Sequence, residues 1–139
     1  MEKTGSEVQD CIYQLLRRSD LAGMLNGAVY KNGFRPRDSK AEDSIVTFTA
    51  GSPGQAQVGI VTVSIYIPDI DPYKNGVTVK DGERCMEVEI AAQKWVASLP
   101  AGKTGGYLNR LNDTIKTEQE PSIGQHFVAI KLKYKYANN

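Results

Sequence analysis

The sequence predicts an α+β fold, in which a mostly antiparallel sheet of about four to five strands carries one long helix across it and a further helix near the N-terminus. Residues 58–67 form an uncharged, β-branched segment, residues 81–99 carry apolar side chains at helical spacing, and residues 126–136 alternate strictly between apolar and polar side chains. A chain of 139 residues is the size of one domain, so we expect residues 1–139 to form a single domain.

The segment VGIVTVSIYI, residues 58–67, predicts the central strand of the sheet. Its two alternating sets of side chains are both largely apolar, which is typical of a strand that is covered on both faces. Such a strand needs a neighbouring strand on each side and a helix packed on at least one face. We therefore expect the rest of the chain to be arranged around it.

The N-terminal third predicts an amphipathic helix followed by a short turn and a short strand. Ser6 is a suitable N-cap, and apolar residues at spacings of three and four predict a helix over residues 7–18. Asp20 is expected to cap a second short helical turn that ends at Asn26-Gly27. Residues 28–30 then predict a short strand, and the polar residues 34–43 an exposed loop.

The middle of the chain predicts a hairpin. Residues 44–50 (SIVTFTA) alternate like a strand, and residues 51–57 join them to the central strand through a loop that contains two glycines and a proline. The central strand is expected to stop at Pro68. Residues 69–80 then predict a polar loop with a small extended piece at residues 77–79.

The C-terminal half predicts the long helix and the last strand. Asp81 is expected to begin a helix that runs to residue 99, where a proline and a glycine follow. Residues 107–116 fit both a helix face and the start of a strand, so their structure stays open, and residues 121–124 predict a turn. In the last strand we expect one face to hold Val128, Ile130, Leu132, Tyr134 and Tyr136, and the opposite face to hold Lys131, Lys133 and Lys135.

Composition and charge exclude several classes of protein. Hydrophobic residues make up 40% of the chain, charged residues 24%, and the net charge is +1, so the totals indicate neither a nucleic-acid-binding protein nor a membrane protein. The first residues include acids and no apolar run, which argues against a signal peptide. Cys11 and Cys85 fall on apolar helix stripes and predict buried free thiols of a reducing compartment.

Two motifs come close to ligand-binding loops and fail at the positions that matter. Gly102-Lys103-Thr104 ends like a phosphate-binding loop, but Ala97 stands where the first glycine is required and a helix precedes it instead of a strand. Asp71 and its neighbours resemble the start of a calcium loop, but Gly82 replaces the bidentate glutamate. A weak cation site at Asp69 and Asp71 remains as an alternative.

The remaining candidates for chemistry also favour structural interpretations. His126 is the single histidine, so it has no partner for a zinc site of the usual kind. Glu118 and Glu120 have the spacing of a paired acid and base in a strand, but turn-forming sequence surrounds them and a solvated hairpin end fits better. We therefore expect no catalytic residues, no bound cofactor and no metal.

The lysines at positions 131, 133 and 135 line one face of the expected last strand. They could contact phosphate, but no aromatic side chain stands between them on that face. A solvated face or a protected sheet edge explains them more simply. A charged surface between subunits, or lining the lumen of a ring, is the other interpretation.

Five segments, taken together, resemble a known family. They are IYQLLRRSDLAGMLNGAVY near the start, SIVTFTA and VGIVTVSIYIPD in the middle, ERCMEVEIAAQKWVASL in the long helix and QHFVAIKLKYKY at the end. Their order and character are similar to those of the tail terminator, or tail completion, proteins of long-tailed bacteriophages and prophages. The resemblance covers nearly the whole chain, from Ile12 to Tyr136.

The resemblance implies a structural role without catalysis. Proteins of that family form a ring, usually of six subunits, on the last ring of a finished tail tube, where they stop tube growth and receive the head connector. It implies that the partners are further copies of this chain, the tail tube protein and the head connector protein, with no membrane and no sequence-specific nucleic acid. The implied location is the host cytoplasm during assembly and then the tail of the virion.

Three loops and one strand face are the candidates for contacts with such partners. We expect the loop at residues 51–57 to become ordered on docking, because it is rich in glycine and proline and carries no charge. A head–tail connector protein of the same particle is an alternative function, and a small ligand-binding domain is another. The candidate contact residues are Arg35, Arg37, Lys40, Gly51, Pro53, Gln55, Asp71, Tyr73 and Lys74 in the loops, and Lys131, Lys133 and Lys135 on the strand.

Overall fold

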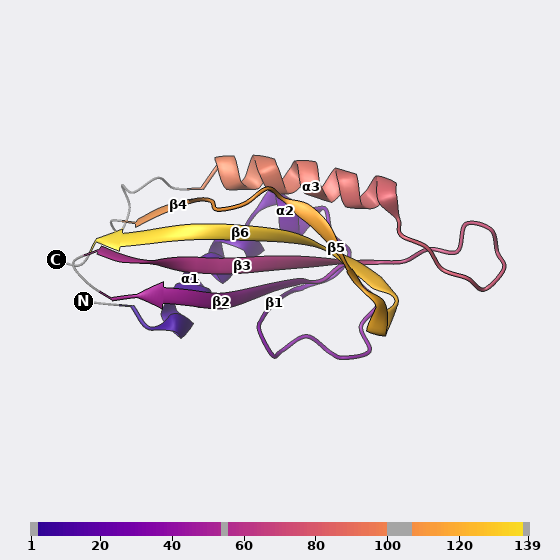
Figure 1. Ribbon diagram of the computed structural model, residues 1–139, viewed down its shortest axis with the longest axis horizontal. Helices are drawn as coiled ribbons and strands as arrows, with labels where there is room; N and C mark the ends of the chain where they lie inside the picture. Colours follow the sequence, from indigo (N-terminus) through magenta and orange to yellow (C-terminus); the bar gives the residue numbers. More distant parts are fainter. Residues whose placement is uncertain (1–2, 54–55, 100–106, 138–139) are drawn as a thin grey trace.

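The computed structural model describes residues 3–53, 56–99 and 107–137 of the chain. It confirms the α+β class, with helices packed on one face of a mixed sheet (Figure 1). The elements in chain order are α1 (Gly5–Arg17), α2 (Asp20–Gly23), β1 (Val29–Lys31), β2 (Ser44–Ser52), β3 (Ala56–Pro68), α3 (Gly82–Ala97), β4 (Tyr107–Leu111), β5 (Lys116–Glu120), the 3₁₀ turn η1 (Pro121–Ile123) and β6 (Gln125–Ala137).

The sheet has the strand order β1-β2-β3-β6-β4, and β5 also pairs with β6. All neighbours run antiparallel except β1 and β2, which run parallel. The two longest strands, β3 and β6, pair along their full length, from Ala56 opposite Ala137 to Pro68 opposite Gln125. This long central pair sets the length of the sheet (Figure 1).

The predicted central strand does lie in the middle, between β2 and β6. One of its two side-chain sets, which includes Val61, Val63 and Ile65, is fully buried. The other set, which includes Ile60 and Tyr66, is only half-buried. The prediction that both faces would be covered is therefore correct only in part for the described residues, because the helices pack on one face and the loop of Arg35 covers only one end of the other.

Side-chain caps begin each of the three helices. Thr4 caps α1 in a reciprocal capping box with Glu7, so the expectation that Ser6 would be the cap is wrong by two residues. Ser19, not Asp20, caps α2. Asp81 caps α3 as expected, since its carboxylate accepts a hydrogen bond from the backbone N–H of Arg84 at 3.2 Å.

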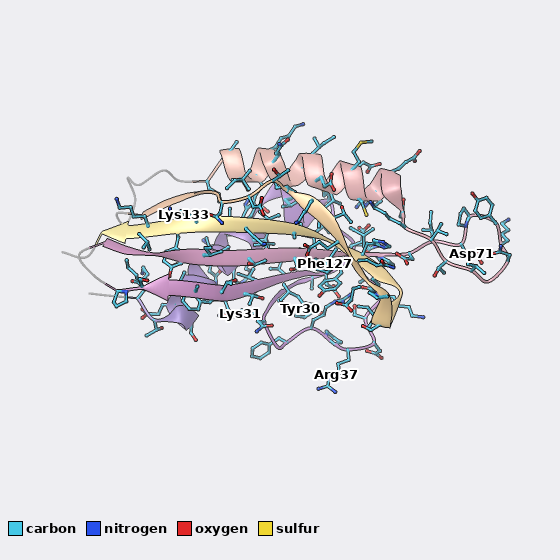
Figure 2. The ribbon with its side chains drawn as sticks, in the orientation of Figure 1. Tyr30, Lys31, Arg37, Asp71, Phe127 and Lys133 are labelled. Atoms are coloured by element: carbon cyan, nitrogen blue, oxygen red, sulfur yellow. The ribbon has the colours of Figure 1, made fainter. Side chains whose placement is uncertain are left out.

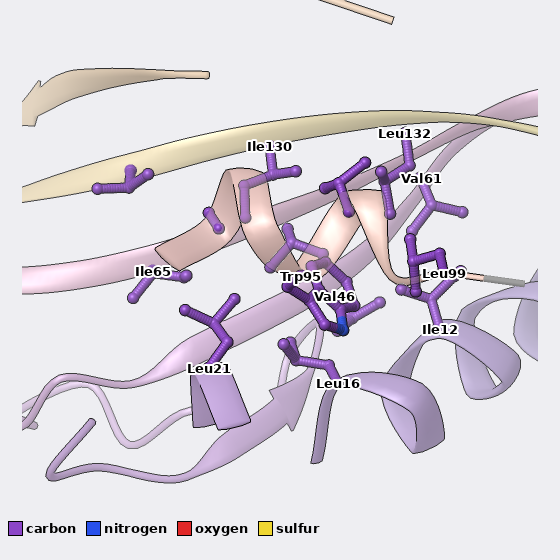
Figure 3. Close-up of a cluster of buried hydrophobic side chains, with 14 of the residues drawn as sticks. Ile12, Leu16, Leu21, Val46, Val61, Ile65, Trp95, Leu99, Ile130 and Leu132 are labelled. Carbon is purple, nitrogen blue, oxygen red and sulfur yellow. The ribbon is translucent and has the colours of Figure 1, made fainter. Parts of the chain in front are cut away.

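A single buried cluster lies between the helices and the sheet (Figure 3). Trp95 of α3 shares it with Ile65 of β3, Ile12 of α1 and Leu21 of α2, so every helix contributes to the same core. Each such large apolar side chain contributes about 1.5–3 kcal/mol to the free energy of unfolding. The cluster joins elements from both halves of the chain, which agrees with the predicted helix across an apolar sheet.

The hairpin between β2 and β3 is shorter than predicted, because both strands continue into the expected loop. Gly51 pairs with Gly59 across the two strands, and the buried ring of Tyr134 lies beneath them. A Cβ atom on either glycine would collide with the Tyr134 hydroxyl. The glycines at this end therefore make room for an aromatic side chain, which leaves Gly51 within a strand and not in a loop.

Two strands occupy the segment whose structure stayed open and the segment before the predicted turn. Residues 107–111 form β4, and residues 116–120, including Glu118 and Glu120, form β5. β5 and β6 form a hairpin across η1, which confirms the predicted turn at residues 121–124 and the hairpin end at the two glutamates, although both side chains are half-buried. Both strands pair with β6, β5 with its first half and β4 with its second half. The sheet consequently has six strands among the described residues, more than the four to five predicted.

Among the helices of the described ranges, none is both long enough and apolar enough to span a membrane.

Candidate functional site

The most prominent surface feature is residues 69–80, which we call the arm. It extends beyond the end of the sheet that lies away from the β2–β3 hairpin (Figure 1). Every residue from 70 to 80 is exposed, although several are apolar. Tyr73 is 77% exposed and Val77 61% exposed. Exposed apolar side chains gathered on one projection are typical of a contact surface for another molecule.

The backbone of the arm is held in one conformation by its own hydrogen bonds. Ile70 and Val79 exchange two backbone hydrogen bonds of 2.9 and 2.8 Å, which confirms a short extended piece in this segment. At the tip, the Asp71 carboxylate accepts hydrogen bonds from the N–H groups of Asn75 at 3.1 Å and Gly76 at 2.9 Å. The arm is thus ordered while its apolar side chains stay uncovered, which lowers the entropy cost of binding a partner.

The base of the arm is attached to the start of β6. The Asp69 carboxylate lies 2.7 Å from Nδ1 of His126, and the backbone N–H of Asp69 donates to the Gly124 carbonyl. The side chains of this pair are only 13% and 15% exposed. The single histidine therefore has a structural partner, and their contact connects the base of the arm to β6.

Arg35, a predicted contact residue, is turned inward. Its Nε donates to the Asp43 carboxylate at 2.9 Å, and its Nη2 donates to the Gln125 side chain at 3.0 Å. Its guanidinium also lies 4.2 Å from the centre of the Tyr66 ring. Arg35 therefore fixes the loop to the sheet, and the prediction of an exposed loop is wrong for its last residues, Glu42 and Asp43, which are buried.

The buried carboxylate of Asp43 stays charged because its partners outweigh its burial. Burial alone raises the pKa of Asp43, but hydrogen bonds from Ser39, the backbone of Ala28 and Arg35 bring that pKa below its ordinary value. Hydrogen bonds to the ionised form favour it over the protonated form. This group therefore stabilises the fold and holds no proton to exchange near neutral pH.

A second ion pair joins the same loop to α3. Arg84 donates through Nε and Nη2 to both oxygens of Glu42, at 2.7 and 2.8 Å, and also to the Met24 carbonyl at 2.7 Å. The hydrogen bonds from Arg84 lower the pKa of Glu42 against the effect of burial. Sequence patterns did not point to this pair, since its members lie 42 residues apart.

The other predicted contact residues are exposed but separated. Figure 2 shows Arg37 on the loop below the sheet, Asp71 in the arm and Lys133 toward the opposite end of β6. Lys40 and Pro53 are exposed, and Gln55 lies outside the described residues. Lys131 is half-buried, while Lys133 and Lys135 are exposed on the face opposite the buried Val128, Ile130, Leu132 and Tyr134, as predicted. The remaining two arm residues, Tyr73 and Lys74, are exposed beside Asp71.

The described residues offer little chemistry. No group of three or more His, Cys, Asp or Glu side chains in the described ranges could hold a metal ion, and Asp69 and Asp71 use their carboxylates in the contacts given above. Cys85 is buried, which raises the pKa of its thiol, whereas Cys11 is only half-buried, so the prediction of two buried thiols is correct for one of them. The Gly102-Lys103-Thr104 segment lies outside the described residues.

A groove of about 580 Å³ lies between α2 and α3. Its lining includes the apolar Leu21, Met24 and Trp95 and the charged Arg18, Asp20 and Lys94. His126, Glu118 and Asp71, the polar groups considered for a ligand pocket, do not line it. The groove therefore does not bring together the polar groups that the ligand-pocket alternative named.

Sequence comparison gives no family for this chain, since no protein-family model and no curated protein matches it. Among solved structures, one whose name is only a serial identifier aligns with 95% of this chain and 96% of its own, with 18% sequence identity and a TM-score of 0.46. That name states no function, and a likeness at this level carries no functional argument.

Proposed function

We propose that this protein is a non-enzymatic subunit of a phage or prophage tail, which caps the tail tube, stops its elongation and prepares it to receive the head connector. The observation that carries the proposal is the arm, an ordered projection with uncovered apolar side chains. The order of helices and strands, which resembles that of tail terminator proteins, supports the same conclusion. On this proposal the protein acts first in the host cytoplasm and then in the virion tail.

The arm suits a protein that is soluble alone and binds when a repeating partner becomes available. Its exposed apolar area is small, so one arm is expected to bind weakly. A ring places several arms on one tail tube at once. Their simultaneous binding raises the overall affinity, although each subunit makes the same contact as it would alone. We assign Tyr73 and Val77 to the contact with the tail tube protein.

The test is to mix the purified protein with tails assembled from the genes that flank its own, and to image the mixture by negative-stain electron microscopy. We expect density at one end of each tail, and tails of uniform length when the protein is present during assembly. Binding to DNA-filled heads instead of tails would identify a head connector. Binding to neither, with tails of normal length in its absence, would refute both roles.

A matched pair of variants tests the arm. Tyr73→Ala should reduce tail binding at least about tenfold, because an aromatic anchor is lost from the contact. Phe34→Ala removes an aromatic side chain that is equally exposed, at 73%, on a different loop, and should leave binding unchanged. If the two variants reduced tail binding equally, the arm would not be the part of the protein that contacts the tail.

A further inference from the structure

Two outer surfaces of this protein have complementary charge and apolar character. The first, which we call the α3 stripe, consists of the exposed Glu83, Met86, Glu87 and Ile90 on one side of the long helix. The second, which we call the lysine face, lies on the sheet face that no helix covers. It consists of Lys133 and Lys135 of β6 with the half-buried Ile60 and Val58 of β3 beside them.

The α3 stripe has no partner within the described part of the chain. Met86 is 58% exposed and Ile90 49% exposed, although α3 buries Cys85, Val88 and Trp95 on its other side. Glu87 contacts Arg84 at 3.1 Å but keeps 60% of its side chain exposed. One side of α3 packs in the core, and its opposite, acidic and apolar side makes no packing contact in the fold. That exposed side is therefore available to bind another molecule.

The lysine face is the uncovered part of its sheet face. Near the arm, Arg35 lies over Tyr66, and Tyr66 packs on Phe127 with ring centres 5.4 Å apart, so the loop covers that end. Toward the β2–β3 hairpin, β3 and β6 continue without such a cover, and Figure 2 labels Lys133 there. In this region Val58 pairs with Lys135 and Ile60 with Lys133, so each lysine has an apolar neighbour.

The spacings of the two surfaces match. Glu83 and Glu87 are four residues apart in a helix, which is about 6 Å along the axis. Lys133 and Lys135 are two residues apart in a strand, which is about 6.7 Å. Met86 and Ile90 have the same spacing along the helix as the two glutamates. Ile60 and Val58 have the same spacing along their strand as the two lysines. A helix laid along the strands therefore brings acids to lysines and apolar side chains to apolar side chains together.

We propose that the α3 stripe of one subunit docks on the lysine face of a second copy of this chain. The two surfaces lie on opposite outer layers of the fold, one beyond the helices and one beyond the sheet, so one molecule cannot join them itself. A contact between two different surfaces is heterologous, and it closes into a ring when successive rotations add to a full turn. The proposal rests on the ring that the proposed function requires, and it names the two surfaces that form it.

Charge exchange tests the contact. Lys133→Glu with Lys135→Glu makes both surfaces acidic, and Glu83→Lys with Glu87→Lys makes both basic, so neither variant should associate with itself. We expect each to weaken self-association at least about tenfold, as measured by sedimentation velocity at low salt. An equimolar mixture of the two variants should recover association, because each then offers the surface that the other lacks. Arg17→Glu with Arg18→Glu changes the net charge as much as the lysine exchange does, at exposed positions outside both surfaces, and should behave as the wild type.

Apolar variants give an independent test. Met86→Ser with Ile90→Ser should weaken association without lowering the melting temperature, since both side chains are exposed in the monomer. If the wild type is monomeric at every concentration reached, the same variants are scored by the number of subunits bound per tail. Charge exchanges that leave association or tail occupancy unchanged, or a mixture that fails to recover it, would overturn this contact while leaving tail capping intact. A wild-type protein that neither self-associates nor binds tails would overturn both.

Discussion

Gly59 is a residue at which one added carbon would disturb the long central pair of strands. A Cβ atom there would meet the backbone oxygen of Ala50 and the Tyr134 hydroxyl, and the backbone atom cannot move without breaking the β2–β3 register. Gly82, at the start of α3, has nothing within 4 Å of a Cβ atom. An added methyl group would therefore be crowded at Gly59 and unobstructed at Gly82.

We expect Gly59→Ala to lower the free energy of unfolding by about 2–3 kcal/mol, because overpacking forces backbone shifts. Gly82→Ala should change it by less than about 1 kcal/mol, or raise it, because alanine suits a helix better than glycine. Urea denaturation of the two variants beside the wild type measures both values. Similar losses in the two variants would contradict the close approach at Gly59.

Glu42 gives stability that depends on pH. Its pKa is lowered in the folded protein, so its contribution is complete above the ordinary carboxyl range and is lost as the pH falls through the folded value. Glu42→Gln should lower the free energy of unfolding by about 1–3 kcal/mol near pH 7, since Arg84 loses a charged partner.

The gap between wild type and Glu42→Gln should then shrink as the pH falls below the ordinary carboxyl range, because a protonated glutamate resembles glutamine. Urea titrations across this range measure the gap. A gap that stayed constant with pH would show that the ionised carboxylate is not the stabilising form.

At the scale of elements, the arm shows how a segment can be ordered without a hydrophobic core. Its conformation depends on the Asp71 carboxylate and on the single bridge between Ile70 and Val79. A change at its tip should therefore loosen the arm and leave the rest of the fold intact.

Asp71→Ala should speed amide hydrogen exchange at Asn75 and Gly76, whose N–H groups lose their acceptor. The free energy of global unfolding should change by less than about 0.5 kcal/mol, because the arm is exposed. Asp113→Ala is a matched control, since that carboxylate caps another exposed turn through the N–H of Thr114 at 2.8 Å. Unchanged exchange at the tip in Asp71→Ala would mean that the arm holds its shape by other contacts.

The elements that the sequence predicted well are those in which local pattern and tertiary environment agree. An uncharged β-branched run located β3, strict alternation located β6, and a long apolar stripe located α3. Residues 107–116 were ambiguous because their apolar spacing satisfies both periods, and pairing with β6 decides the outcome. The capping residue was open to a better prediction, since Thr4 and Glu7 already have capping-box spacing.

The surface was predicted less well, because long-range partners decide which polar residues are exposed. Arg35 has the composition of a loop residue, yet its partner Gln125 lies 90 residues away. Conversely, Met86 and Ile90 are apolar residues of the predicted helix, and only the burial of its opposite side shows that they remain outside. The arm was recognised as a candidate contact by residues Asp71, Tyr73 and Lys74, but its rigidity depends on hydrogen bonds that composition does not reveal.

At the scale of the whole molecule, one buried cluster connects all three helices with the sheet. Trp95 is the single tryptophan of the chain, and it lies in that cluster at 6% exposure. Its fluorescence therefore reports the packing of the shared core, while far-ultraviolet circular dichroism reports the helices and strands.

We expect the two signals to change together on urea unfolding, with the same midpoint, as for a single cooperative domain. This would support the prediction that residues 1–139 form one domain. Separate midpoints would indicate that part of the chain unfolds independently of the core around Trp95.

The edges of the sheet affect how readily the protein aggregates at high concentration. One edge ends in β1, which is three residues long, and beyond it the exposed part of β2 is interrupted by an irregularity between Phe48 and Ala50. The other edge is divided between β4 and β5, of five residues each. Short and irregular edge strands offer other chains few backbone groups to pair with, so amyloid-like aggregation is suppressed. A component synthesised ahead of need could thus accumulate in a crowded cell and remain usable until its moment of incorporation.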